Sequence, residues 1–247
     1  MAYNGATFHG WQSQNNAVTV QSETEKALSL LLHSKTGITG AGRTDTGVHA
    51  RRYYAHFDYD SPLDELTLQN IAYRMNHLLP QSIAIYKIFR VQDDLHARFS
   101  ALSRTYKYYI CRNHDPFALG FSYRLTIPLN IELMNQAATE LLRYKDFTCF
   151  TKSGTQNSTN ICSVFESFWE EQGNFLIYTT KANRFLRNMV RAMVGTLIDV
   201  GKNKLTMDDF RHILMNGTRS DAGQSVPACG LFLEDIEYPE FAQLKQH

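Results

Sequence analysis

The sequence has few cysteines, no long apolar run and almost no net charge. Its four cysteines, Cys111, Cys149, Cys162 and Cys229, lie far apart, which excludes the short paired spacings of a zinc site and the density of a secreted disulfide framework. We expect plain reduced thiols. No apolar stretch reaches the roughly eighteen residues that a membrane span needs, and no basic segment followed by an apolar one opens the chain, so we expect a cytoplasmic protein.

The formal net charge of +1 excludes a protein coated in basic residues, so nucleic-acid binding would require an uneven distribution of charge. The distribution is uneven, because two stretches carry four basic residues each and no acid. They are residues 96–114, with Arg98, Arg104, Lys107 and Arg112, and residues 172–198, with Lys181, Arg184, Arg187 and Arg191. Solvated faces of helices and strands can carry such runs as well.

Helical periodicity and capping residues predict five helices. They cover residues 20–32 with Thr19 as N-cap, residues 66–78 ending before Pro80, residues 131–144, a long helix from an Asn183 cap to Gly201, and a helix opened by the Thr206–Asp209 capping-box spacing. Strands are predicted over residues 53–59, 83–91, 105–111 and 230–238, with a hairpin over residues 161–182 that turns at 172–174.

Strands and helices mix in both halves without the strict alternation of a doubly wound parallel sheet. The sequence therefore predicts an α+β fold with mainly antiparallel sheets. We expect two similar α/β lobes, residues 1–115 and residues 116–247, because His-Asp-Pro and Ile-Pro interrupt the pattern between Asn113 and Asn130.

The segment Gly40–Ala50 places three glycines, Arg43, Asp45 and His49 within eleven positions. Glycines permit close backbone approach, so such a loop can hold a carboxylate in a fixed orientation beside a ligand. A tight connection between a helix and a strand, with Asp45 accepting turn hydrogen bonds, fits the same residues. A phosphate-binding P-loop is excluded, because the Gly-Lys-Ser/Thr ending is absent.

Arg184, Arg187 and Arg191 are three and four residues apart on the predicted long helix, so they would project as one stripe. Three arginines on a stripe repel one another unless acids of the fold or a polyanion pair them.

A third cluster, Ser103 to Tyr109, alternates basic and aromatic residues on a predicted strand. Such a strand suits a nucleic-acid surface, and it equally suits a strand with an aromatic core face and a basic solvent face.

Taken together, these segments resemble the bacterial tRNA pseudouridine synthase A family. The family's Gly-Ala-Gly-Arg-Thr-Asp-x-Gly-Val-His-Ala loop is present in full, with Asp45 as its aspartate. The likeness extends in order through Tyr3–Gly5, Phe8–Gln12, His96–Ser100, Arg104–Tyr108, Asp146–Thr148, Asn183–Arg191, Ala222–Gln224 and Pro227–Leu231. One departure is Asn4, where the family usually has aspartate, and we expect an incomplete first strand.

The resemblance implies the pseudouridine synthase fold, with the active-site cleft between the lobes, and a cofactor-free and metal-free isomerisation of uridine at positions 38 to 40 in the anticodon stem and loop of tRNA. It further implies a homodimer in which one tRNA spans both subunits. Asp45 would be the catalytic nucleophile and Arg187 the cation that holds it ionised. Tyr106 would stack on the target base, Arg43 would touch RNA or help to extract the base, and Leu231 would line the uracil pocket. Arg184, Arg191 and Arg104 would contact phosphates.

Two other functions fit parts of the pattern. One is a tRNA-binding protein that has lost catalysis. The other is a hydrolase of small substrates that uses Asp45 and His49 as an acid/base pair, for which the three arginines would have no use.

Overall fold

The computed structural model describes residues 1–152 and 159–239. The chain forms two compact units: residues 1–102 with the C-terminal stretch from Leu233, and residues 103–232. The predicted lobes, residues 1–115 and 116–247, therefore do not coincide with these units, and the division into lobes stays a prediction. The α+β class with mainly antiparallel pairing is confirmed.

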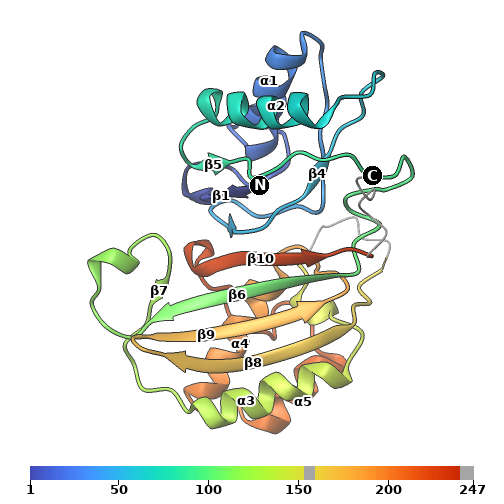
Figure 1. Ribbon diagram of the computed structural model, residues 1–247. Helices are drawn as coiled ribbons and strands as arrows, with labels where there is room; N and C mark the ends of the chain where they lie inside the picture. Colours follow the sequence, from blue (N-terminus) through green and yellow to red (C-terminus); the bar gives the residue numbers. More distant parts are fainter. Residues whose placement is uncertain (153–158, 240–247) are drawn as a thin grey trace. The chain divides into compact units, whose positions relative to one another are not determined.

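The first unit combines two helices with short strands. The helices α1 (Val20–Leu32) and α2 (Glu65–Leu78) lie side by side over the strands of this unit (Figure 1). Its strands are β1 (Ala2–Tyr3), β2 (Thr39–Gly40), β3 (His49–Ala50), β4 (Ala55–His56), β5 (Ile83–Ala84) and the Leu233–Glu237 part of β10 (Leu231–Glu237). Strand β1 pairs antiparallel with β3 and β5, and β2 pairs antiparallel with β4.

Both predicted helices of the first unit are confirmed, and so is the Thr19 cap. The Thr19 hydroxyl accepts the Ser22 N–H, and the Ser22 side chain accepts the Thr19 N–H, which makes a capping box. Helix α2 begins after the Asp64 cap and ends two residues before Pro80, which cannot continue a helix.

The strands predicted over residues 53–59 and 83–91 are wrong in extent, because only two residues of each belong to a strand. Strand β5 stops at Ala84 because the Asn76 side chain takes both backbone groups of Ile85, at 2.8 Å for each bond. Asp58 and Asp60, which fit a pleated strand poorly, follow β4.

The second unit is built on the strands β6 (Ser103–Cys111), β8 (Val164–Gln172) and β9 (Phe175–Ala182) (Figure 1). Strand β9 pairs antiparallel with β6 and β8, and β7 (Tyr123–Arg124) pairs parallel with β6. The predicted hairpin is confirmed: Gln172 faces Phe175, and Gly173 between them has a φ of +57°.

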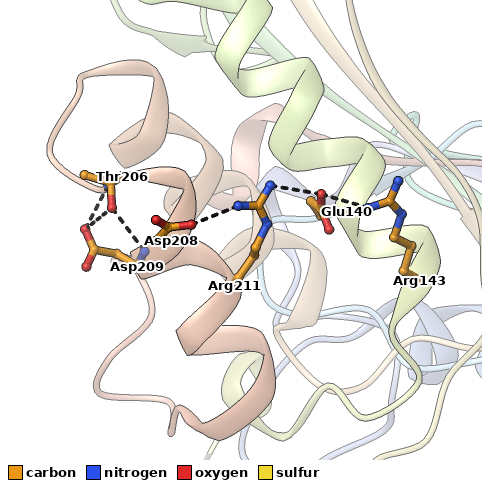
Figure 2. Close-up of polar contacts among 6 residues, drawn as sticks. All are labelled: Glu140, Arg143, Thr206, Asp208, Asp209 and Arg211. Atoms are coloured by element: carbon orange, nitrogen blue, oxygen red, sulfur yellow. Dashed lines mark hydrogen bonds and ion pairs between the residues drawn. The ribbon is translucent and has the colours of Figure 1, made fainter.

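Three helices complete the second unit: α3 (Ile131–Glu140), α4 (Met189–Gly201) and α5 (Met207–Asn216). Helix α3 packs against β8 and α4, and α5 packs against both α3 and α4. The predicted capping box of α5 is confirmed, since Thr206 and Asp209 exchange hydrogen bonds (Figure 2). Arg211 of α5 joins the Glu140 carboxylate of α3 at 3.4 Å, and Arg143 binds the same carboxylate at 3.1 Å (Figure 2).

Helix α4 ends at Gly201, as predicted, and the glycine packs closely against a side chain of α3. A Cβ at this position would lie 2.5 Å from Sδ of Met134 on α3, whereas the left-handed backbone that stops the helix belongs to Asn203, with a φ of +55°.

The four cysteines are free thiols. Burial raises the pKa of Cys149 to about 12 and that of Cys162 to about 11. In the described part of the chain, we find no helix both long and apolar enough for a membrane span.

Candidate active site

Asp45 lies in the loop that joins β2 to β3 in the first unit. Its side chain is half-buried, and it follows the buried Thr44. The Asp45 carbonyl accepts the Val48 N–H at 3.1 Å, and Gly47 in this turn has a φ of +78°, a conformation that favours glycine. The loop thus contains a turn, but it joins two strands and not a helix and a strand, and the acceptor is the Asp45 backbone carbonyl. The turn fixes the backbone that carries the carboxylate.

The segment from Gly5 to Trp11 is packed against the loop backbone. The Trp11 N–H donates to the Thr44 carbonyl and the Gly47 N–H donates to the Phe8 carbonyl, each at 3.3 Å. Gly10 has a φ of +83°, and a Cβ on it would lie 2.3 Å from the Thr44 carbonyl oxygen. A Cβ on Gly5 would lie 2.0 Å from the Val48 carbonyl oxygen. Only glycine lets the two segments approach this closely.

A buried aromatic cluster supports the part of the loop that precedes Asp45. The rings of Trp11 and Tyr53 lie 4.1 Å apart, and Tyr3 contacts both. The Tyr53 hydroxyl donates to the Gly42 carbonyl, and the Tyr3 hydroxyl lies 2.9 Å from Oγ1 of Thr44. The two phenol groups thus hold the Gly42 backbone and the Thr44 side chain on the N-terminal side of Asp45, so the carboxylate is presented by a rigid support.

His49 and Arg43 occupy contrasting positions in the same loop. His49 is buried, and its Nδ1 accepts the Gly5 N–H at 3.1 Å, so the imidazole holds the packed segment in place. Proton transfer through Nδ1 would break that bond, which argues against the acid/base pair of a hydrolase. Arg43 is exposed, and its Nε donates to Oε1 of Gln12 at 3.3 Å.

In the second unit, β6 carries Tyr106 and its neighbours. Alternation along the strand places Arg104, Tyr106 and Tyr108 on one face, so basic and aromatic side chains are not sorted to opposite faces. Tyr106 is half-buried, with the Phe185 ring 5.1 Å away and edge-on. Burial raises the pKa of Tyr108, whose hydroxyl donates to the Pro227 carbonyl at 2.8 Å.

The predicted start of the long helix at Asn183 is wrong. Asn183 remains beside the strands, because its N–H donates to the Ser163 carbonyl and its Oδ1 accepts the Ser163 N–H at 2.7 Å. Helix α4 begins only at Met189, after Asn188 in the left-handed conformation with a φ of +65°. Residues 184–188 are irregular.

The three arginines therefore do not form one helical stripe. Arg184 and Arg187 precede α4, and Arg191 lies within its first turn. Arg187 is exposed and Arg184 is half-buried. The Arg191 Nε donates to the Val226 carbonyl at 2.8 Å, and the Arg104 Nη1 donates to the Asn183 carbonyl at 2.8 Å. Both side chains thus hold the backbone of this unit.

The segment before Leu231 approaches α4 closely. A Cβ on Gly195 would lie 1.9 Å from the Gln224 carbonyl oxygen, and a Cβ on Gly223 would lie 2.7 Å from the Thr196 backbone nitrogen. The Thr196 hydroxyl accepts the Gly223 N–H at 2.9 Å. Leu231 follows this segment and is buried.

Within residues 1–152 and 159–239, no three His, Cys, Asp or Glu side chains gather where they could hold a metal ion.

The sequence is similar to known proteins over nearly its full length. The sequence profile described as tRNA pseudouridine synthase matches residues 137–239. The tRNA pseudouridine synthase A of Bacteroides fragilis is 48% identical over 97% of this chain and 95% of its own length. The protein of that name from Parabacteroides distasonis is 48% identical over 97% of this chain and 94% of its own length. The protein of that name from Thermoanaerobacter sp. is 37% identical over 96% of this chain and 96% of its own length.

The chain belongs to the tRNA pseudouridine synthase A family. The resemblance inferred from the sequence is confirmed, and with it the assignment as an isomerase. The likeness covers both units.

Sequence reasoning missed the residues that support the Asp45 loop: Gly5, Gly10, Trp11 and Tyr53. The signal for Gly5, Gly10 and Trp11 was present, since the segments 3–5 and 8–12 belong to the family pattern without bearing any chemistry of their own, whereas Tyr53 lies outside that pattern. Short motifs rich in glycine and aromatic residues indicate close packing against a site as readily as a site itself.

Proposed function

We propose that this protein isomerises uridine to pseudouridine at positions 38 to 40 of the anticodon stem and loop of tRNA. The observation that carries the proposal is the half-buried Asp45 in the complete family loop, which packs against the Gly10 segment and is supported by the Trp11–Tyr53 cluster. Family membership over 97% of the chain supports it.

In the proposed reaction, Asp45 is the nucleophile. The carboxylate bonds to the nucleotide, the bond from N1 to C1′ breaks, the uracil turns, and a bond from C5 to C1′ forms. The bond between the nucleotide and the carboxylate breaks again, which frees Asp45. The C5 proton then leaves, and N1 gains a proton, so the reaction is an isomerisation overall. A carboxylate can do this without a metal or an activating base.

We assign the neighbouring roles as follows. Arg187 is the cationic partner that keeps Asp45 ionised, and its exposure leaves the guanidinium accessible to a carboxylate. Tyr106 stacks on the target base, while Phe185 limits the movement of its ring from the side. Leu231 lines the uracil pocket, and Arg43 touches the RNA beside the flipped nucleotide.

Arg184, Arg191 and Arg104 contact the RNA backbone in this proposal. Phosphate contacts offset the free energy of a few kcal/mol required to unstack and flip the target nucleotide. Arg104 and Arg191 also keep the Asn183 and Val226 carbonyls in place, so they act on RNA binding by positioning as well as by charge.

We further propose a homodimer that acts on tRNA in the cytoplasm. The loop before β7 exposes 92% of Phe117 and 81% of Leu119, and such apolar exposure suits a contact with a second copy. Light scattering of the purified protein should give twice the mass of one chain, and Phe117→Ser with Leu119→Ser should lower it. A monomeric parent protein would contradict the dimer.

Tritium release tests the activity directly. A tRNA labelled at C5 of uridine should lose label when the protein is added, and a tRNA with cytidine at positions 38 to 40 should retain its label. An RNA-binding protein without catalysis releases no label from either substrate. Equal release from both tRNAs would contradict the proposed positions.

A further inference from the structure

Phe99 is a large apolar side chain that the first unit leaves 74% exposed. Single exposed apolar residues are common on protein surfaces and need no function. Phe99 differs from such residues in its neighbours. The Arg98 guanidinium lies 5.4 Å from the centroid of the Phe99 ring, and the centroid of the His96 ring lies 4.4 Å from that centroid. The cation and the two rings form one cluster, in which Arg98 and Phe99 are exposed and His96 is half-buried.

The backbone under this cluster is fixed. The N–H groups of Arg98 and Phe99 both donate to Nδ1 of His96, at 3.1 and 3.3 Å. The His96 N–H donates to Oγ of Ser100, and the Ser100 N–H donates to the His96 carbonyl. A turn closed in this way presents Phe99 outward with little freedom to bury itself.

The turn is also anchored to the strand that pairs with the start of the Asp45 loop. The Ala97 N–H donates to Nδ1 of His56 at 3.1 Å, and the Tyr238 hydroxyl donates to the Ala97 carbonyl. His56 ends β4, which pairs with β2, where the loop begins at Gly40. The exposed ring is therefore held by the same framework as the proposed nucleophile.

We propose that Phe99, with Arg98 against its ring, is a stacking platform for an unpaired base of the tRNA other than the target uridine. Unpaired bases of RNA stack on aromatic rings and on guanidinium planes, and this cluster contains one of each. The guanidinium also supplies a positive charge. The proposal rests on the proposed function for its choice of ligand. It adds a second base contact, beyond Tyr106.

Phe99→Trp provides a direct probe, because the two native tryptophans, Trp11 and Trp169, are buried. Adding tRNA should quench the emission of the new indole and protect it from acrylamide. Tyr73→Trp is the matched control: Tyr73 is 65% exposed and lies 4.4 Å from the His77 ring. Its emission should not change, and an unchanged Phe99→Trp signal at saturating tRNA would overturn the proposal.

Affinity measurements separate stacking from simple apolar contact. In an Asp45→Asn background, Phe99→Ala should weaken tRNA binding by between about fivefold and a hundredfold, the effect of removing one stacked base. Phe99→Trp should bind as the parent does, and Phe99→Leu should bind as weakly as Phe99→Ala. Full affinity in the leucine variant would contradict stacking.

Two further outcomes have distinct meanings. If Phe99→Ala changes the oligomeric state and leaves tRNA affinity unchanged, the cluster is an interface between copies and the proposal is wrong. If the parent releases no tritium while Phe99→Ala still weakens tRNA binding, the proposed function fails and the platform stands.

Discussion

The Asp45 loop and the Asn183–Arg191 segment are held in place by different means. Glycines at positions 5 and 10 let a second backbone segment pack against the loop, and a buried aromatic cluster supports it. The Asn183–Arg191 segment is held by side chains: Asn183 binds Ser163, Arg104 binds the Asn183 carbonyl, and Nδ2 of Asn188 donates to Oγ of Ser225. The Asp45 loop depends on close backbone packing and on aromatic support, whereas the Asn183–Arg191 segment depends on individual side-chain hydrogen bonds.

This difference predicts unequal tolerance to substitution. A change that adds atoms between two packed backbones displaces both, whereas the loss of one side-chain hydrogen bond removes a limited free energy.

Gly10→Ala should have the largest effect. The added Cβ would meet the Thr44 carbonyl oxygen at 2.3 Å, and a φ of +83° is strained for alanine. We expect a loss of about 2 kcal/mol or more in the free energy of unfolding and at least a roughly hundredfold fall in tritium release, because a displaced catalytic group is costly. Gly37→Ala is the control, since a Cβ there meets nothing within 4 Å. Equal effects of the two substitutions would contradict the packing argument.

Asn183→Ala should have an intermediate effect. It removes the acceptor of the Ser163 N–H, so denaturant unfolding should show a loss of about 1–2 kcal/mol. Tritium release should fall less than in Gly10→Ala. Asn113→Ala, which removes an exposed bond to Asn174, should change stability very little. If Asn183→Ala changed stability as little as Asn113→Ala, the Asn183–Arg191 segment would not depend on the bond between Asn183 and Ser163.

Arg184→Gln and Arg191→Gln should alter the salt dependence of tRNA binding. Each lost phosphate contact reduces the slope of log K against log salt by about 0.7 to 0.9. Arg143→Gln makes the same change of charge at a side chain that binds Glu140, and its slope should equal that of the parent (Figure 2). A parental slope in both test variants would place the RNA contacts elsewhere.

A substitution in the capping box of α5 should give the smallest effect, because its hydrogen bonds join Thr206 to Asp209 and hold neither the Asp45 loop nor the Asn183–Arg191 segment. Hydrogen bonds from the Thr206 side chain and backbone hold the pKa of Asp209 below its usual value. A carboxyl group whose pKa is lower in the folded state stabilises the folded protein at pH values above its unfolded-state pKa, which is near 4. This stabilisation is lost as the pH falls through the folded-state pKa.

The gap in melting temperature between the parent and Asp209→Ala should therefore be full at neutral pH and should close in acid. Tritium release at neutral pH should be unchanged. A gap that widens in acid would contradict the assigned role of the carboxylate.

Local sequence signals predicted the helix ends and turns that are determined by residues close in sequence. The Thr19 and Thr206 caps, the stop before Pro80 and the turn at Gly173 each depend on residues within one turn of the chain. The same reasoning failed at Asn183, because its partner Ser163 is twenty residues away and no helical periodicity reveals that bond. Strand β5 was overestimated for the same reason, since Asn76 ends it from another element.

In the candidate site, too, features determined by neighbouring residues could be predicted and those determined by distant residues could not. The loop that carries Asp45 could be predicted because its glycines, arginine and aspartate are adjacent in sequence. Its support could not, because the contacts of Gly10 with Thr44 and of Tyr53 with Gly42 appear only when the chain is folded.

Asp45→Asn tests the central claim most directly. The amide keeps the shape of the side chain and removes the nucleophile, so tRNA binding should stay close to that of the parent while tritium release from C5-labelled tRNA is abolished. Release within about tenfold of the parent would correspond to a barrier change below about 1.4 kcal/mol and would contradict Asp45 as the nucleophile.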